Sequence, residues 1–168
     1  MHCGEQWSKK LSEEETEAVR EYTKNAYKNI NAALRGIDKK LYPENAEYAK
    51  TLHRILKQTE LPKDCVVYRG CSSKVLGANR FLPDSMLVGK TFIEEGFLST
   101  SLSKEDAFEG DVLLEIEAPK GSQGIYVGYT GALGHNEREV LFDVGQVMTI
   151  LDVYRDEKGR RILRVAML

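Results

Sequence analysis

Two carboxylates, Glu137 and Glu139, stand two residues apart at the point where a glycine-rich loop is expected to become a strand. Side chains two residues apart in a strand point to the same side of the sheet, so both can face one ligand. Paired carboxylates serve reactions at an anomeric carbon, where one stabilises positive charge and the other handles a proton. A solvated strand edge accounts for the same pair, so the motif by itself leaves both interpretations open.

Two further motifs carry hydrogen-bonding chemistry. Arg69 is followed directly by Gly70, and this combination of a guanidinium fork with an approachable backbone suits a phosphate or a carboxamide. Surface ion pairs use such arginines as well. In the run Ser99-Thr100-Ser101, strand alternation points Ser99 and Ser101 one way and Thr100 the other. No histidine stands in a fixed relation to them, which disfavours a serine hydrolase triad and favours hydroxyls that position another group.

The elements that must position these residues change in character along the chain. Ser12 and Glu15 form a capping-box pattern, and an apolar stripe then runs to a terminator at Gly36, with a short continuation to Leu41. A second helix follows Pro43 and closes at 61–62. The remainder predicts a brief helix from Ser103 to Phe108 and short strands over 65–69, 91–93, 96–101, 112–118, 124–127, 139–142, 146–154 and 161–167.

Helices followed by many short strands predict an α+β fold with antiparallel pairing, because a parallel sheet would need strands that alternate with helices. We expect a single domain over 1–168, with a helical part at 1–62 and a β-rich part at 63–168. The length of 168 residues agrees with one domain.

Composition narrows the function classes. Hydrophobic residues at 42% and charged residues at 30% fit a soluble globular protein rather than a disordered or membrane protein. The net charge of −2 excludes a nucleic-acid footprint, and the more acidic C-terminal half suits contact with a cationic group. Cys3, Cys65 and Cys71 are expected to be free thiols, since neither they nor the three histidines have metal-ligand spacing. The N-terminus lacks the apolar core of a signal peptide.

In this order and spacing, Arg69-Gly70, Ser99-Thr100-Ser101 and Glu137-Arg138-Glu139 resemble the Arg–Ser–Glu class of mono-ADP-ribosyltransferases. That class includes the enzymatic subunits of binary actin-modifying toxins and the Rho-modifying exoenzymes. Residues 22–35 are similar to the NAD-facing first helix of the family, and the resemblance extends from about Glu17 to the C-terminus. It implies N-terminal helices packed on two roughly perpendicular, mainly antiparallel β-sheets, with NAD bent in the cleft between them.

The resemblance also implies a role for each matching residue. Glu139 would bind the nicotinamide ribose and stabilise an oxocarbenium-like transition state, while Ser99 orients its carboxylate. The family often carries an arginine for the diphosphate soon after Phe108, but 108–115 has no basic residue. Either NAD binds more weakly or Arg35 or Arg80 substitutes. The implied catalytic residues are Arg69, Ser99, Glu137 and Glu139, and the implied NAD-binding residues are Tyr22, Asn31, Arg35, Arg69, Gly70, Thr100, Ser101 and Phe108.

Glu137 indicates the acceptor. The family places Gln at this position for an asparagine acceptor and Glu for an arginine acceptor, and a guanidinium with a pKa above about 12 needs a carboxylate to orient it. The resemblance therefore implies transfer of ADP-ribose from NAD, as substrate and without a metal, to an arginine of a target protein. A surface ion pair of Glu137 is the simpler alternative.

We further expect a monomer that contacts neither nucleic acid nor membrane and acts in a cytoplasm, including that of a host cell after delivery by another route. Two other functions stay open. One is NAD glycohydrolysis at the same site, with water as the acceptor. The other is a noncatalytic module of this fold that binds a nucleotide or a protein.

Overall fold

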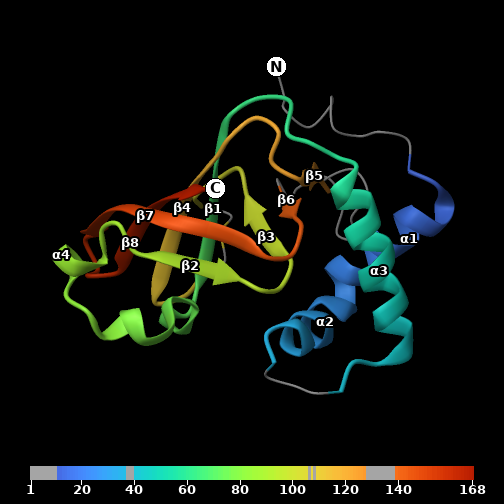
Figure 1. Cartoon of the computed structure of the whole chain (residues 1–168), viewed down its shortest axis with the longest axis horizontal. Coiled ribbons are helices and arrows are strands. Elements are labelled where there is room, and N and C mark those ends of the chain that lie inside the picture. Colours follow the sequence, from blue (N-terminus) through green and yellow to red (C-terminus); the bar gives the residue numbers. More distant parts are fainter. Residues whose placement is uncertain (1–10, 37–39, 106, 108, 128–138) are drawn as a thin grey trace.

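The computed structural model describes residues 11–36, 40–105, 107, 109–127 and 139–168. The predicted site residues Phe108 and Glu137 lie outside these ranges. Within them the expected α+β fold is confirmed: helices gather on one side of β5 and β6, and the remaining strands extend away from them (Figure 1).

The first helical region begins as predicted at a capping box. The Ser12 hydroxyl accepts a hydrogen bond from the Glu15 backbone N–H at 3.2 Å, and the Glu15 carboxylate accepts one from the Ser12 N–H at 3.0 Å. The region ends at Gly36, whose φ of 73° lies in the left-handed region that favours glycine. It is not one regular helix, because a π-helical turn, η1 (Tyr22–Ala26), separates α1 (Glu13–Glu21) from α2 (Tyr27–Leu34).

The π-helical turn changes which side chains share a face. Tyr22 and Asn31 are nine residues apart, about two and a half turns of a regular α-helix, which would place them on opposite faces. The wider turn shifts this phase, and the Asn31 Nδ2 donates a hydrogen bond to the Tyr22 hydroxyl at 2.8 Å. The apolar spacing predicted the helix but not this insertion.

The second predicted helix is α3 (Pro43–Lys57), with proline in its first turn. Leu52, Ile55 and Leu56 are its buried residues, whereas His53 is only half-buried. Its ring Nδ1 lies 2.7 Å from a buried carboxylate oxygen of Asp143.

The strands form one continuous eight-stranded sheet in the order β2-β7-β8-β4-β1-β3-β6-β5. Every neighbouring pair is antiparallel except β4 with β8. The predicted strands recur within two residues at each end, and their bounds are β1 Cys65–Cys71, β2 Thr91–Glu94, β3 Leu98–Ser101, β4 Val112–Ala118, β5 Gly124–Tyr126, β6 Glu139–Phe142, β7 Gln146–Arg155 and β8 Arg161–Met167.

The two sheets that the resemblance implied are therefore two parts of one hydrogen-bonded sheet. A single register pair, Tyr68 with Ser101, joins β1 to β3 and so connects the parts. In Figure 1, β2 and β7 run roughly across the view while β1 and β3 run up it, so the strand direction turns strongly along the sheet.

One predicted element is wrong and two were missed. Among the described residues of 103–107 the chain makes bends and a turn, not a helix, because the Ser103 hydroxyl donates to the Glu105 carboxylate at 2.7 Å instead of capping backbone N–H groups. The missed elements are the 3₁₀ segment η2 (Ser73–Phe81) and the short helix α4 (Asp84–Leu87), both of which follow β1.

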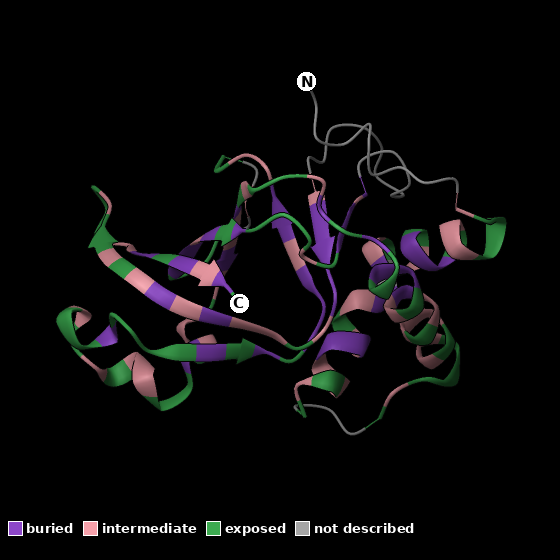
Figure 2. Cartoon of the chain, turned by 45° about the horizontal axis from the view of Figure 1, so that its top comes forward, coloured by how far each residue is buried: buried purple, intermediate pink, exposed green. Residues whose placement is uncertain are grey.

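Two hydrophobic cores lie on opposite faces of β6. Figure 2 shows buried residues in purple both on the strands and on the helices. Leu141 packs with Val19, Tyr22 and Ile30 of the helices, whereas its neighbours Val140 and Phe142 belong to the core among the other strands. Because side chains alternate along a strand, Glu139 projects on the side of Leu141, toward the helices.

A charged cluster ties α4 to the β7–β8 hairpin. Asp84 accepts hydrogen bonds from Arg155 at 3.1 Å and from Arg161 at 2.9 Å. The hydrogen bond from Arg155, reinforced by the charge of Arg161, lowers the pKa of Asp84 below its ordinary value. Its stabilising effect is therefore present above a pH of about 4 and is lost as the pH falls through the lowered pKa.

We predict that Asp84→Asn destabilises the protein more at pH 6 than at pH 3, because acid protonates the same carboxylate in the wild type. Urea unfolding at both pH values measures the difference. The exposed Glu60→Gln serves as the control variant. A destabilisation by Asp84→Asn that is the same at both pH values would contradict the prediction.

Candidate functional site

The site lies where β1 and β3 separate. Beyond the single pair of Tyr68 with Ser101, continued antiparallel pairing would bring Gly70 opposite Ser99. The backbone carbonyl of Ser99 instead accepts a hydrogen bond from the Arg69 Nη1 at 2.9 Å. A guanidinium thus occupies the place where the ladder between the strands would continue, and Arg69 and Ser99, predicted from separate motifs, are in direct contact.

Tyr22 connects this point to the helices. Its side chain is buried, its ring packs edge-on against Phe97 with centroids 5.4 Å apart, and its hydroxyl hydrogen-bonds Asn31 and Ser99. Burial raises the pKa of the Tyr22 phenol to about 12, against hydrogen bonds that lower it, and the carboxylate of Glu139 raises it further. The phenol is therefore neutral at physiological pH and holds Ser99 in place as a hydrogen-bonding partner.

Glu139 is the first residue of β6 and stands in register with Ser101. Its backbone carbonyl accepts a hydrogen bond from the Val127 N–H at 3.0 Å, so its main chain is held on both sides. Since paired residues of antiparallel strands project on the same face, Glu139 and Ser101 face the helices together with Ser99. The fold brings together Arg69, Ser99 and Glu139, three of the four predicted catalytic residues.

Asn31 fixes the loop before β3. Its Oδ1 accepts a hydrogen bond from the buried Phe97 N–H at 3.0 Å, while its Nδ2 serves Tyr22. A Cβ atom on Gly96 would lie 2.8 Å from the Asn31 Oδ1, so glycine is required there by close approach. The contact that Asn31 makes is structural, and its predicted contact with NAD stays a prediction.

Arg35 is held by Glu94, which is not among the residues predicted from the sequence motifs. Its Nε donates to the Glu94 carboxylate at 2.7 Å, and the same oxygen accepts a hydrogen bond from the Gly96 N–H at 3.0 Å. Glu94 is only 4% exposed, so this is a partly buried ion pair. The available signal was strand alternation, which places Glu94 on the same face as the buried Phe92.

A cavity of about 550 Å³ opens beside these groups, between the end of α2, the end of β1, η2 and β2. Its lining combines four cations with two carboxylates. Cys71 also lines it, and burial raises the pKa of this thiol to about 11, which keeps it protonated and a poor nucleophile. The charged lining residues are Arg35, Arg69, Lys74, Arg80, Glu94 and Glu95.

The remaining predicted residues take different places. Gly70 is buried in β1 beside the separation from β3. The Thr100 hydroxyl points away from Ser99 and donates to the Val140 carbonyl at 2.7 Å, which joins β3 to β6. The Ser101 hydroxyl accepts a hydrogen bond from the Ser103 N–H at 3.2 Å. Their parts in NAD binding stay predictions, as do those of Phe108 and Glu137 outside the described residues.

Two features are absent from the described part of the chain. Its His, Cys, Asp and Glu side chains form no group of three or more arranged to hold a metal ion. None of the helices within the described ranges is long and apolar enough to cross a membrane.

Comparison with known proteins places the chain in a family. A sequence profile described as ADP-ribosyltransferase exoenzyme matches residues 2–167, and the chain belongs to this family. The expected resemblance is therefore confirmed.

Individual relatives agree with this assignment. An NAD(+)–arginine ADP-ribosyltransferase, EFV, of Enterococcus faecalis is 28% identical over 167 residues. The alignment covers 89% of this chain but only 32% of that relative, so the chain spans about a third of its length.

Solved structures share the fold. C3larvin, an ADP-ribosyltransferase toxin of Paenibacillus larvae, is 28% identical with a TM-score of 0.76, covering 98% of this chain and 99% of that one. Plx2a, another ADP-ribosyltransferase toxin of that organism, has a TM-score of 0.82 at 24% identity, covering 98% and 90%.

The buried phenol of Tyr22 generates a pH prediction. Because its pKa is about 12 in the folded protein and about 10 when unfolded, the stability it contributes is complete below pH 10 and is lost as the pH rises toward 12. We expect Tyr22→Phe to cost about 1 kcal/mol at pH 7 for the lost hydrogen bonding. The variant should also lose less stability than the wild type between pH 10 and 12.

Urea unfolding across this pH range provides the measurement, and Tyr42→Phe, at a position 51% exposed, is the matched control. An alkaline loss of stability that is equal in Tyr22→Phe and the wild type would show that another group is responsible.

Proposed function

We propose that this chain transfers ADP-ribose from NAD to an arginine side chain of a protein and releases nicotinamide. One observation carries the proposal: Glu139, Ser99 and Arg69 converge at Tyr22, where the sheet separates beside the cation-lined cavity. A carboxylate toward the helices and a positively charged cavity suit the two ends of NAD, a ribose that develops positive charge and a diphosphate that carries negative charge.

The chemistry follows from the charges of the reacting groups. The bond between the ribose C1′ and the nicotinamide nitrogen breaks first, and the nicotinamide leaves with the electron pair as a neutral ring. Glu139, hydrogen-bonded to a ribose hydroxyl, stabilises the oxocarbenium-like charge that remains. An arginine nitrogen then attacks C1′ from the opposite face, which inverts the configuration and releases a proton.

Glu137 supports arginine as the acceptor. A guanidinium stays charged at physiological pH, so a carboxylate is needed both to orient it and to receive the proton that it loses on attack. Glu137 precedes Glu139 by two residues, and the relative EFV is by its name an NAD(+)–arginine ADP-ribosyltransferase. We propose that residues 1–168 act as one catalytic unit, as a monomer, on a protein target.

The central test incubates the protein with labelled NAD and agmatine as a small arginine analogue, and measures both nicotinamide release and label transfer. We expect Glu139→Gln to lower both by about 10²–10³, the size of one lost electrostatic stabiliser of the transition state. Glu137→Gln should abolish transfer and retain NAD cleavage, because it removes only the group that handles the acceptor. Glu117→Gln, exposed on β4, is the control.

Each alternative function has its own outcome in this assay. Nicotinamide release by the wild type without transfer to agmatine or to any protein of a cell lysate would indicate a glycohydrolase. No turnover by the folded wild type would indicate a noncatalytic module. Equal loss of cleavage in both variants would remove the division of roles between Glu137 and Glu139.

A second prediction concerns Glu94. Glu94→Gln weakens the ion pair that orients Arg35, so we expect the KM for NAD to rise about tenfold while kcat changes less than twofold. Glu95→Gln is a closely matched control, because Glu95 lines the same cavity but is exposed. Steady-state kinetics on variants with unchanged circular dichroism measures the split. A fall in kcat with an unchanged KM would place Glu94 in the chemical step instead.

A further inference from the structure

We propose that Lys74 and Arg80, both on η2, form the phosphate-binding wall of the cavity and hold the diphosphate of NAD opposite Arg35. This inference rests on the proposed function and deepens it, because it identifies a segment outside the sequence motifs as the one that binds the negatively charged diphosphate. Both residues line the cavity together with Arg35 and Arg69, from elements that are separate in sequence.

The side chains that line the cavity carry more positive charge than negative charge. Glu94 pairs with Arg35, and Glu95 is exposed at the rim. Within the described part of the chain, Lys74 and Arg80 have no ion pair, so the lining keeps a formal excess of two positive charges. The diphosphate of NAD carries two negative charges and would match this excess.

Arg35, which lines the cavity, also has a side-chain donor that is not used. The Nε of Arg35 bonds Glu94, but its buried Nη2 has no hydrogen-bond partner among the described residues. Buried donors are nearly always paired in folded proteins, because burial removes the water that would otherwise pair them. A phosphate oxygen would satisfy this donor once a small rotation of the Arg35 guanidinium exposes it to the cavity.

Hydrogen bonds anchor the backbone of η2 near both of its ends. The Lys74 N–H donates to the Ser72 hydroxyl at 3.3 Å, and the Ser73 N–H donates to the Asp111 carboxylate at 3.0 Å. At the other end, the carbonyl of Arg80 accepts a hydrogen bond from Arg161 at 3.3 Å. The Arg80 guanidinium also lies 4.5 Å from the centre of the Phe81 ring, which restricts its motion.

The kink at Gly77 allows residues from both ends of η2 to line the same cavity. Its φ of 59° and ψ of −137° interrupt the segment between Lys74 and Arg80, a conformation that favours glycine. Asp111 explains why the charge comes from η2: the stretch after Phe108 contributes this carboxylate, which binds η2, rather than a basic side chain that could reach a phosphate.

The test measures binding rather than turnover. Isothermal titration calorimetry with NAD, ADP-ribose and nicotinamide riboside is applied to Lys74→Ala, Arg80→Gln and the double variant. We expect each single change to weaken NAD and ADP-ribose binding about tenfold, the size of one charge-assisted hydrogen bond, and the double change to weaken it more. Binding of nicotinamide riboside, which lacks the diphosphate of NAD, should be unaffected.

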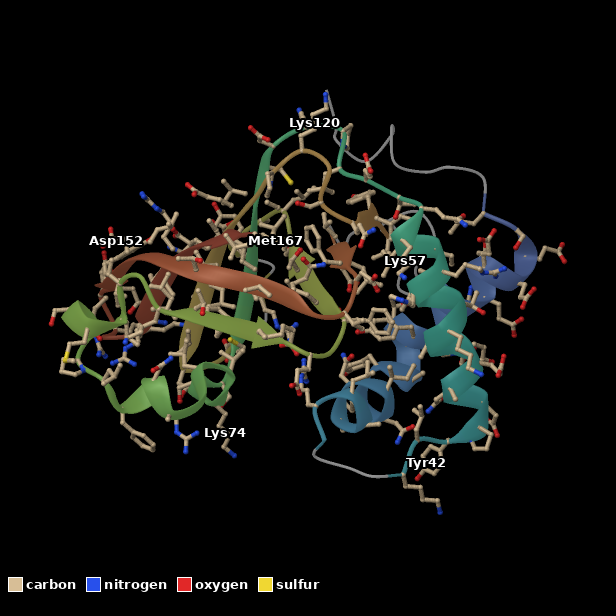
Figure 3. The ribbon with its side chains drawn as sticks, in the orientation of Figure 1. Tyr42, Lys57, Lys74, Lys120, Asp152 and Met167 are labelled. Atoms are coloured by element: carbon tan, nitrogen blue, oxygen red, sulfur yellow. The ribbon has the colours of Figure 1, made fainter. Side chains whose placement is uncertain are left out.

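Matched controls remove basic side chains elsewhere. Lys120, which Figure 3 shows at the opposite end of the view from Lys74, is changed to Ala, and the exposed Arg164 to Gln. Arg80→Lys should keep most of the affinity, and the salt dependence of NAD binding should fall in the double variant.

The outcomes separate this inference from the proposed function. A wild type that binds NAD and modifies agmatine, with Kd values for NAD unchanged in the two single variants and the double variant, would overturn the phosphate wall and leave the proposed function intact. Equal weakening of nicotinamide riboside would show that the variants disturb the cavity as a whole, which also overturns it. A wild type that binds no NAD would refute both proposals.

Discussion

The contact between the Arg69 guanidinium and the Ser99 carbonyl is the interaction on which the site depends. An eight-stranded sheet would ordinarily bury the backbone of β1 and β3 in a continuous ladder, with no room for a ligand between them. Here one register pair joins the two strands, and a side chain satisfies the next carbonyl. Because the exposed carbonyl is paired, the separation costs little, and it places a fixed cation beside Ser99 and Glu139.

The helices are connected to this point by a polar chain in an otherwise apolar interface. Tyr22 hydrogen-bonds Asn31 and Ser99, and Asn31 in turn binds the backbone before β3. Buried polar groups that are fully paired favour one arrangement over its alternatives, since any shift leaves a donor unmet. This network of hydrogen bonds therefore sets the position of Ser99 relative to the helices, and the hydrophobic cores on either side of β6 stabilise the arrangement.

Much of the architecture could be predicted from local signals in the sequence. Strand alternation and turn residues predicted most strand bounds within two residues, and the capping box at Ser12 marked the first helix, because these signals are local. The π-helical turn and η2 were not predicted, since packing and the positive φ of Gly77 decide them rather than propensity. Glu94 was missed because its role depends on Arg35, which lies 59 residues earlier in the chain.

The sequence alone determined the residue types, their order and the family to which the chain belongs. The reason is that the Arg, Ser and Glu motifs and the spacing of apolar residues are local patterns. Only the tertiary structure decided which of them meet. It directed Ser99 toward Tyr22 and Thr100 toward the β6 backbone, gave Arg35 its buried carboxylate, and brought Lys74 and Arg80 to the cavity that Arg69 lines. The physical reason is that charge and hydrogen-bond partners are set by distance in space, whereas spacing in sequence sets only which face a side chain takes.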